Sequence, residues 1–389
     1  MKLVLCLEYG ITQHGGTEVL VTELIRGLSV NHKVVLVSDD DASTVAQSSV
    51  VTCLDEHIPW RAEPASPGRS QILANRIART NPDLVHFHLG GSYGWSARAF
   101  NKCPIVHVLR KSIPTLSTNH GAFSLLEGYC WERRHFLVKL GLLPMAWLSK
   151  QYVLSFLHTE VAVSQNDFRK LKRRYPAMRS KFRWIYHSRI RESHFTSSHR
   201  DREKVILCAG TIGPRKGQTY LVEAFCRLAS RFPDWRLVLI GREGDAAMGQ
   251  AIRERIATSG LAGQVLWLGS CSDAELQEWL KKSAIFAMPS LSEGLGLSLQ
   301  EAQFYGCACV GTSCGGVTDL IEDGYDGLLV PPGKAEPLAE ALEKLMNDPV
   351  LRTKLSEEGA RSVLAKGMTA GKMVTAYEQL YREILGSRP

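Results

Sequence analysis

Two glutamates, Glu293 and Glu301, stand eight positions apart and enclose the segment EGLGLSLQE. An apolar strand pattern (284–290) precedes this segment, and an amphipathic helix pattern begins near Ser298. A strand, a glycine-rich turn and a helix start together form an anion site, because free backbone N–H groups and the positive helix end converge there. Two carboxylate acceptors beside such a turn suit a ligand with phosphates and hydroxyls, which describes a nucleotide sugar. A helix start with acids placed only to suit its dipole would carry the same residues.

Each half of the chain also has a glycine-rich turn after its first predicted strand. These turns are GGTE (15–18) and AGTIGPRKGQ (209–218). Neither has the G-x-G-x-x-G spacing, so the sequence does not support a nicotinamide cofactor. Arg215 and Lys216 add cationic donors where a diphosphate could lie, because Arg binds phosphate oxygens in a bidentate way and Lys acts as a point charge. A basic pair on a solvated loop is the alternative.

The composition is that of an ordinary globular protein, with 44% hydrophobic and 22% charged residues among 389. This length suits two or three domains. No apolar run reaches the roughly 18–20 residues of a membrane span, and the opening MKLVLCLEYG lacks the features of a signal peptide. The ten cysteines include no C-x-x-C pair, which predicts reduced thiols in a cytoplasmic protein. Cys307, Cys309 and Cys314 match no zinc spacing and are expected in the core.

Short apolar runs alternate with helix-length segments along nearly the whole chain. Such runs predict parallel strands covered on both faces. The predicted strands are 2–9, 33–39, 83–88, 104–110 and 160–165 in the first half, and 204–210, 236–241, 264–270, 284–290 and 307–313 in the second. The polar segment ESHFTSSHRDRE (192–203) predicts a linker. The expected fold class is α/β, with two doubly wound domains of similar size.

The second half resembles the nucleotide-sugar domain of retaining GT-B glycosyltransferases, those of glycosyltransferase family 4. The matching segments are GTIGPRKG, LIGREG, VLWLGSCSDAEL, MPSLSEGLGLSLQEA and CACVGTSCGGVTDLIEDGYDGLLVPPG. The first half matches through the GGTE turn and the order of its elements. The resemblance implies two Rossmann-like domains facing a cleft: an acceptor-side domain (1–195) and a nucleotide-sugar domain (196–370). It also implies a final helix (371–389) that crosses back to the first domain.

The resemblance assigns roles to individual residues. It implies that Glu301 holds the ribose hydroxyls of the donor, and that Glu293 contacts the transferred sugar and supports the charge that develops during transfer. It implies that Lys216 neutralises the leaving diphosphate and that Gly16 lets the first-domain loop close over it. The backbone N–H groups expected to line the donor belong to Gly294, Leu295, Gly296, Leu297 and Ser298. Such sites resemble metal-independent ones without a separate cofactor, and the acidic run 39–41 is interpreted as a solvated loop.

Three positions depart from the family pattern. Thr211 stands where an arginine is common, and Arg215 can supply the missing guanidinium from a shifted position. The family often has a histidine at the end of the fourth first-domain strand, and counting along the predicted strands places Arg110 there. Arg110 cannot act as a general base but can bind a phosphate or an acceptor anion. Glu293 and Arg110 are therefore the predicted catalytic residues. His187-Ser188 replaces the Asn-Gly often found near the linker.

His86 and His88 alternate onto one face of the predicted strand DLVHFH. A pair of this kind can bind a metal, orient an acceptor or cap the strand end with satisfied hydrogen bonds. We favour the cap, because the sequence shows no third ligand.

The formal charge of +8 is concentrated in residues 168–191, where ten of 24 residues are Lys or Arg and none is acidic. Aromatic residues interleave with them, and the strongly apolar segment 136–148 lies just upstream. Nucleic-acid binding suits basic and aromatic interleaving. Peripheral contact with anionic lipid suits this order better, because an apolar segment adjoins the basic one. A buried helix beside a solvated basic face is the third interpretation.

The sequence therefore predicts a metal-independent, retaining hexosyltransferase-type enzyme with a nucleoside-diphosphate sugar as donor. The expected acceptor is a glycan or a lipid-linked molecule of envelope polysaccharide or lipopolysaccharide biosynthesis. The expected location is cytoplasmic, at the inner face of the membrane. A non-catalytic sugar-nucleotide-binding protein of the same fold is the alternative, suggested by Thr211 and Arg110. A nucleotide-sugar epimerase is less supported, because its usual histidine and carboxylate positions are not evident.

Overall fold

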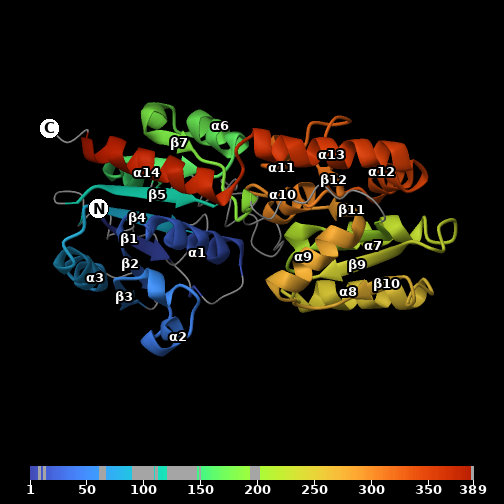
Figure 1. The fold of residues 1–389 in the computed structure, drawn as a ribbon, viewed down its shortest axis with the longest axis horizontal. Coiled ribbons are helices and arrows are strands. Elements are labelled where there is room, and N and C mark those ends of the chain that lie inside the picture. The colour runs from blue at the N-terminus through green and yellow to red at the C-terminus, as the bar shows by residue number, and fades with distance from the viewer. Residues whose placement is uncertain are drawn as a thin grey trace. The chain divides into compact units, whose positions relative to one another are not determined.

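Two compact units make up the chain. The first unit consists of Met1–Arg189 together with Ala370–Pro389, and the second unit consists of Ile190–Thr369. A computed structural model describes residues 1–7, 10–11, 15–60, 67–89, 109, 113–120, 147–148, 150–192 and 202–386. Each unit has one wholly parallel sheet with helices packed around it (Figure 1). The predicted α/β class with two Rossmann-like sheets is therefore confirmed. Within the described residues, no helix combines the length and the apolar character needed to cross a membrane.

The sheet of the first unit has seven strands in the order β3-β2-β1-β4-β5-β6-β7. They are β1 (Lys2–Leu7), β2 (Lys33–Ser38), β3 (Glu56–Pro59), β4 (Leu84–Leu89), β5 (Thr115–Asn119), β6 (Thr159–Ala162) and β7 (Phe182–Trp184). After their first residues, β1 and β2 are buried at every position. Helices cover both faces of a parallel sheet, which explains why these strands are continuous apolar runs.

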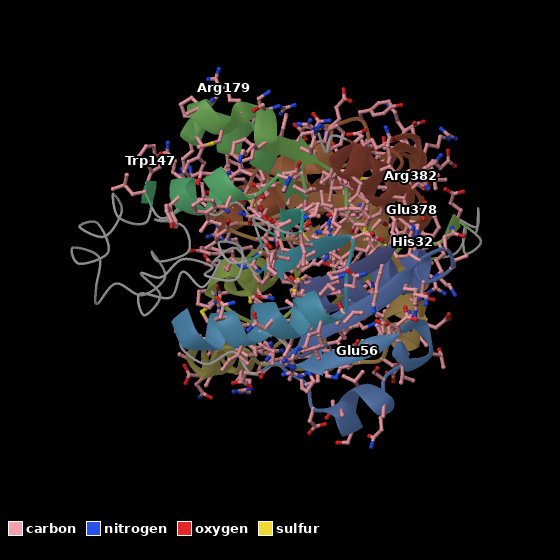
Figure 2. All side chains as sticks on the ribbon, turned by 90° about the vertical axis from the view of Figure 1, so that its left-hand side faces the viewer. His32, Glu56, Trp147, Arg179, Glu378 and Arg382 are labelled. Carbon is pink, nitrogen blue, oxygen red and sulfur yellow. The ribbon has the colours of Figure 1, made fainter. Side chains whose placement is uncertain are left out.

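The helices of the first unit come from both ends of the chain. Among the described residues they include α1 (Gly16–Leu28), α2 (Ala42–Ala46), η1 (Val51–Cys53), α3 (Pro67–Arg79), α6 (Gln165–Arg174), η3 (Pro176–Lys181) and α14 (Ala370–Gly386). Figure 1 shows α14, in red, among the blue and green elements of this unit. His32 Nε2 lies 2.8 Å from Glu378 Oε1, with Arg382 on the other side of the carboxylate (Figure 2). This contact joins α14 to the loop before β2.

The second unit has a six-stranded sheet in the order β10-β9-β8-β11-β12-β13. Its strands are β8 (Glu203–Ala209), β9 (Arg236–Ile240), β10 (Val265–Trp267), β11 (Ser283–Met288), β12 (Ala308–Thr312) and β13 (Leu328–Val330). Its helices are η5 (Pro214–Lys216), α7 (Gln218–Cys226), α8 (Ala246–Thr258), α9 (Asp273–Lys282), α10 (Leu297–Phe304), α11 (Val317–Leu320), α12 (Ala335–Asn347) and α13 (Pro349–Ala365). Large apolar side chains such as Phe225 and Trp235 fill the core between sheet and helices. Local signals place the helix starts: Ser272 and Glu275 form a capping box at α9, and Asp348 caps α13 before Pro349.

The strand order reverses once in each sheet, between β1 and β4 and between β8 and β11. In open parallel sheets, ligands bind beyond the carboxyl ends of the strands at this switch point. In the second unit, the loops that leave β8 and β11 carry the two predicted turns. The topology therefore brings the segment 210–217 beside the segment 289–296.

The sequence analysis missed β5 in the first unit, and its predicted strand 104–110 lies outside the described residues except for Leu109. The strand that pairs with β4 is β5, with His88 opposite Thr118, and it begins after the predicted strand 104–110. Leu109, the described residue of that segment, is helical, and Arg110 lies outside the described residues. The residue that follows β5 is His120. The error arose because β5 reads TLSTN, a polar segment that is nevertheless buried at all five positions.

Candidate functional site

The turn after β8 is shaped to meet the loop after β11. Pro214 starts the short helix η5, and Gly217 follows it in the left-handed region at φ 65°. A Cβ at Gly217 would lie 2.2 Å from the carbonyl oxygen of Pro289, so only glycine allows this approach. The backbone N–H of Leu291 donates to the Arg215 carbonyl at 2.8 Å. The two loops are therefore held together by their backbones.

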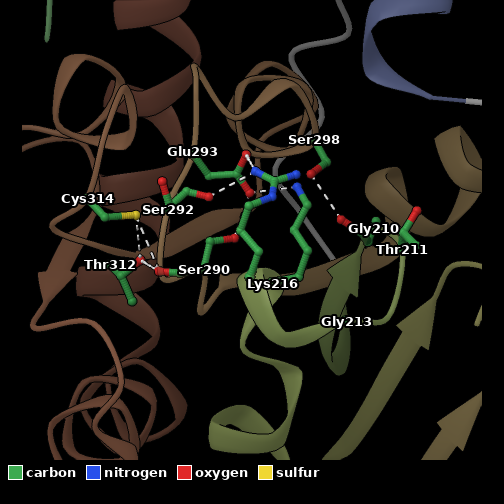
Figure 3. A network of polar contacts seen from close by, with 12 residues as sticks. Gly210, Thr211, Gly213, Lys216, Ser290, Ser292, Glu293, Ser298, Thr312 and Cys314 are labelled. Atoms are coloured by element: carbon green, nitrogen blue, oxygen red, sulfur yellow. Dashed lines mark hydrogen bonds and ion pairs between the residues drawn. The ribbon is translucent and has the colours of Figure 1, made fainter. Parts of the chain in front are cut away.

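Lys216, Arg215 and Glu293 form an ion cluster across these two loops (Figure 3). Lys216 Nζ donates to Glu293 Oε1 at 2.6 Å, and Ser290 Oγ donates to the same oxygen at 2.7 Å. Arg215 Nη1 donates to the Ser292 carbonyl at 2.9 Å and to Glu293 Oε2 at 3.3 Å. Two cations thus surround one carboxylate, which leaves one net positive charge at the switch point.

The carboxyl of Glu293 is buried, with 7% of the residue exposed. Burial raises its pKa, but the charges of Lys216 and Arg215 and the hydrogen bonds from Lys216 and Ser290 together hold the pKa below its ordinary value. Glu293 is therefore ionised at neutral pH. The side chains of Arg215 and Lys216 keep 38% and 21% of their surface exposed, so both cations remain accessible to an anion.

The loop after β12 packs against the backbone of Glu293 and of the residues before it. Thr312 Oγ1 donates to the Ser290 carbonyl, and Cys314 Sγ lies 3.3 Å from the same oxygen (Figure 3). A Cβ at Gly315 would lie 1.8 Å from the carbonyl oxygen of Glu293, so this loop packs directly onto the glutamate backbone. The sequence analysis assigned Cys314 to the core with Cys307 and Cys309.

Cys307 and Cys309 are buried, as expected, and burial raises the pKa of the Cys307 thiol to about 11. Cys314 is only partly buried and belongs to the loop just described. No group of three or more His, Cys, Asp or Glu in the described part of the chain is arranged to hold a metal ion.

The remaining predicted donor residues lie at the start of α10. Gly294, Leu295 and Gly296 are buried, and Gly296 is the residue that precedes the helix. Leu297 and Ser298 are partly exposed, and Ser298 Oγ donates to the Ala209 carbonyl at the end of β8. Glu301 lies farther along α10 and is 6% exposed. Gly16 begins α1 in the first unit.

In the first unit, an imidazole cluster occupies the carboxyl ends of β4 and β5. It comprises His86, His88, His120 and His187, with Thr118 from β5 and the α14 residues Tyr377 and Tyr381. His86 Nδ1 lies 2.7 Å from Tyr381 Oη, and its Nε2 lies 2.7 Å from Thr118 Oγ1. Tyr377 Oη lies 2.7 Å from both Thr118 Oγ1 and His187 Nε2. The hydrogen-bonded cap favoured for the pair holds for His86, but His88 Nε2 has no hydrogen-bond partner among the described residues.

The four imidazoles are uncharged. Desolvation by burial lowers the pKa of His86, His88 and His187 well below the ordinary value and lowers that of His120 to about 3. At neutral pH each ring therefore carries one N–H donor and one acceptor nitrogen. His120 was missed by the sequence analysis, although the small segment NHG after a buried strand is a usable signal.

The interpretation of residues 39–41 as a solvated loop was wrong for Asp40, whereas Asp41 is exposed. Asp40 is 7% exposed and accepts hydrogen bonds from the Ile11 N–H at 2.6 Å and from Ser38 Oγ at 2.7 Å. Asp41 caps α2, and hydrogen bonds from Thr44 and Ser43 lower its pKa to about 2. These carboxylates hold backbone groups at the ends of β1 and β2.

Comparison with known proteins places this geometry in a family. Residues 189–362 match the family described as Glycosyl transferases group 1, and residues 14–188 match Glycosyltransferase Family 4. The chain belongs to the group 1 glycosyltransferases. The two matched segments lie in the two structural units. The two turns that carry the ion cluster, 210–217 and 289–296, lie in the matched segment 189–362.

Relatives of this glycosyltransferase include enzymes with several substrates. It is 26% identical over 411 residues to the D-inositol 3-phosphate glycosyltransferase of Jonesia denitrificans, covering 95% of this chain and 92% of the relative. It is 31% identical over 186 residues to the alpha-D-kanosaminyltransferase of Streptomyces kanamyceticus, about half the length (47%) of each. It is 27% identical over 184 residues to the lipopolysaccharide core biosynthesis mannosyltransferase LpcC of Rhizobium leguminosarum bv. viciae, covering 47% of this chain and 51% of that one.

Solved structures support the fold. Sucrose-phosphate synthase of Thermosynechococcus elongatus matches all of both chains at 18% identity with a TM-score of 0.80. Anabaena Alr3699/HepE, solved in complex with UDP, matches 98% of this chain and 100% of its own at 18% identity and a TM-score of 0.75. The predicted GT-B fold is confirmed.

Proposed function

We propose that this glycosyltransferase moves a sugar from a nucleoside-diphosphate sugar to an envelope glycan or lipid-linked acceptor, with retention of configuration. The observation that carries the donor assignment is the Lys216–Glu293–Arg215 cluster at the switch point of the second sheet. The structurally similar Anabaena Alr3699/HepE, solved with UDP and with UDP-glucose, supports a diphosphate donor and makes uridine donors the first to test.

In this proposal, Lys216 and Arg215 receive the diphosphate as it leaves. The leaving group gains negative charge in the transition state, and fixed cations at a buried helix start stabilise that charge. In the structure both cations are hydrogen-bonded to Glu293. Donor binding therefore shifts them toward the phosphates and frees the carboxylate for the transferred sugar. Because the chain itself supplies two cations, we propose transfer without a metal ion or a separate cofactor.

The backbone at the start of α10 completes the proposed donor site. Gly294 to Ser298 would line the sugar and phosphates, and Glu301 would hold the ribose hydroxyls. Gly16, at the start of α1 in the first unit, would line the phosphates from its own loop. The structure offers His120 for the first-unit position that the sequence analysis gave to Arg110, since His120 is the residue that follows β5.

His120 is neutral, because burial lowers its pKa to about 3. A neutral imidazole in this place would act as a hydrogen-bonding group toward the sugar rather than as an ion.

The acceptor side of the proposal rests on a basic face on α6. We define the basic face as Arg169, Lys170, Lys172, Arg173 and Arg174 of α6. Four of these side chains are exposed and Lys172 is partly exposed. Lys181 does not belong to it, since its Nζ donates to the carbonyls of Leu154, Ser155 and Leu157 at 2.8–2.9 Å.

Exposed apolar side chains adjoin the basic face. Leu148 is 59% exposed and Tyr152 is 42% exposed, four positions apart along a helical stretch. Trp147 Nε1 donates to the carbonyl of Arg174 at 3.1 Å, which fastens this stretch to the end of α6. Figure 2 shows Trp147 and Arg179 projecting from this part of the first unit. Cations beside aromatic and apolar side chains support peripheral contact with anionic lipid, where a lipid-linked acceptor would lie.

One experiment tests the function directly. The purified chain is incubated with a panel of nucleoside-diphosphate sugars, and release of the nucleoside diphosphate is measured with and without EDTA. Slow hydrolysis of one donor, lost in Glu293→Gln, is the expected result, and it identifies the donor without the acceptor. If a donor binds but is neither hydrolysed nor transferred to any extract-derived acceptor, the chain is a non-catalytic binding protein.

A further inference from the structure

In the imidazole cluster, His88 contacts His120, and the proposed transfer gives His88 no role. His88 Nδ1 lies 3.3 Å from His120 Nε2. His88 is 1% exposed, and its ring lies against that of His86, with the centroids 3.8 Å apart and the planes tilted by 39°. His86 is itself held on both ring nitrogens, by Tyr381 and Thr118. His88 therefore cannot turn away from His120 without disturbing a bonded neighbour.

The protonation of His88 follows from its surroundings. Its Nε2 is buried and has no hydrogen-bond partner within the described residues. A neutral ring carries its proton on one nitrogen only. A proton on Nε2 would leave a buried N–H without an acceptor, which proteins tolerate less well than an unused acceptor. A proton on Nδ1 instead makes His88 a donor to His120.

We propose that His88 is a positioning residue that fixes His120 in the tautomer protonated on Nδ1. His120 Nε2 accepts from His88, so the single proton of the neutral His120 ring must sit on the other nitrogen. His120 then offers an N–H donor, not a lone pair, to a ligand oxygen. The catalytic consequence rests on the proposed function, but the tautomer itself does not.

Long-range ¹H–¹⁵N NMR of histidine-labelled protein reads the tautomer directly, because protonated and unprotonated ring nitrogens resonate far apart. The His120 signals are assigned by their loss in His120→Gln. The expected result is a ring protonated on Nδ1 in the wild type and in His88→Asn, whose amide N–H stands near the place of Nδ1. His88→Leu should produce a mixture of both tautomers. His32→Asn is the matched control, since His32 pairs with Glu378 outside the imidazole cluster and its loss should leave the His120 tautomer unchanged.

A wild-type His120 protonated on Nε2 overturns the proposal, and this measurement needs no variant to fold. An unchanged tautomer in a folded His88→Leu protein also overturns it. With an active donor, His88→Leu should lower kcat about ten-fold, the scale of one hydrogen bond, with KM little changed and His88→Asn restoring the rate. If the tautomer responds as expected while no donor is turned over, the proposed function fails and the positioning role of His88 stands.

Discussion

Lys216 and Glu293 should affect nucleoside-diphosphate binding in opposite directions. Lys216 Nζ lies 2.6 Å from Glu293 Oε1, and Arg215 donates to the other carboxylate oxygen. A diphosphate must compete with Glu293 for both cations. Lys216→Ala removes one cation and leaves the carboxylate, so the cluster becomes neutral. Glu293→Gln removes the competitor at nearly constant volume, so the cluster carries two positive charges.

The expected magnitudes follow from these charges. Loss of a charged hydrogen bond to phosphate costs about 1.5–3 kcal/mol, a roughly 10- to 150-fold rise in Kd for Lys216→Ala. Removing a unit charge about 5 Å from a phosphate changes the interaction energy by about 1–3 kcal/mol at effective dielectric constants of about 80 to 20. Glu293→Gln should therefore tighten nucleoside-diphosphate binding about five-fold or more. Its turnover should fall nevertheless, because the carboxylate acts mainly in the transition state.

Isothermal titration calorimetry with nucleoside diphosphates measures both changes. Lys204→Ala is the matched control, because Lys204 stands on the same strand that leads to the site but pairs with Asp234 on the surface. That pair is more than half exposed, so its loss should leave binding unchanged. Thermal unfolding of each variant confirms that the second unit is intact.

Equal weakening in Lys216→Ala and Glu293→Gln would refute the reasoning. It would mean that the ion cluster only holds the two loops in place and that no cation is exchanged from carboxylate to phosphate. Tighter binding in Glu293→Gln together with unchanged turnover would instead exclude a catalytic role for the carboxylate.

Three further predictions concern stability, the nucleoside and the membrane. Because the folded-state pKa of Glu293 is depressed, its ion pairs stabilise the protein above the unfolded pKa of about 4.3, and this stabilisation is lost as pH falls through the folded pKa. The difference in unfolding free energy between wild type and Glu293→Gln, measured by urea denaturation, should therefore shrink between pH 7 and pH 3. Glu301→Ala should weaken binding of a nucleoside diphosphate but not of pyrophosphate, and equal losses for both ligands would remove Glu301 from the ribose. Reversal of the basic face to glutamate should abolish co-sedimentation with anionic vesicles at low salt while nucleotide binding persists; a wild-type protein that stays in the supernatant favours a soluble acceptor.

The strands buried on both faces were predictable because burial leaves a direct mark on composition. β1, β2, β8 and β11 read as apolar runs and were found within one or two residues of their ends. β5 escaped prediction because TLSTN is polar. The Thr118 hydroxyl is acceptable in the interior because His86 and Tyr377 satisfy it, and those partners come from other elements.

The residue types in each of the two turns that form the ion cluster were recognisable in the sequence. Glycines, a basic pair and a glutamate after apolar strands identify turns at strand ends, since these features depend on neighbouring residues alone. The pairing of Lys216 with Glu293, 77 positions apart, follows from the strand order that places β8 beside β11. The sequence indicated two turns with the right chemistry, and the topology made them one site.

Residues whose roles depend on distant partners could not be assigned from the sequence. Asp40 looked like part of a solvated acidic run, but Ser38 and the Ile11 N–H take up its carboxylate. His86 and His187 meet through Thr118 and Tyr377, and Tyr377 arrives on α14 from the far end of the chain. Composition and periodicity therefore determined the α/β class and the apolar strands, and the resemblance of the motifs indicated the family. Tertiary structure decided which polar groups are buried together, because hydrogen bonds and ion pairs form between atoms that are near in space, whatever their separation along the chain.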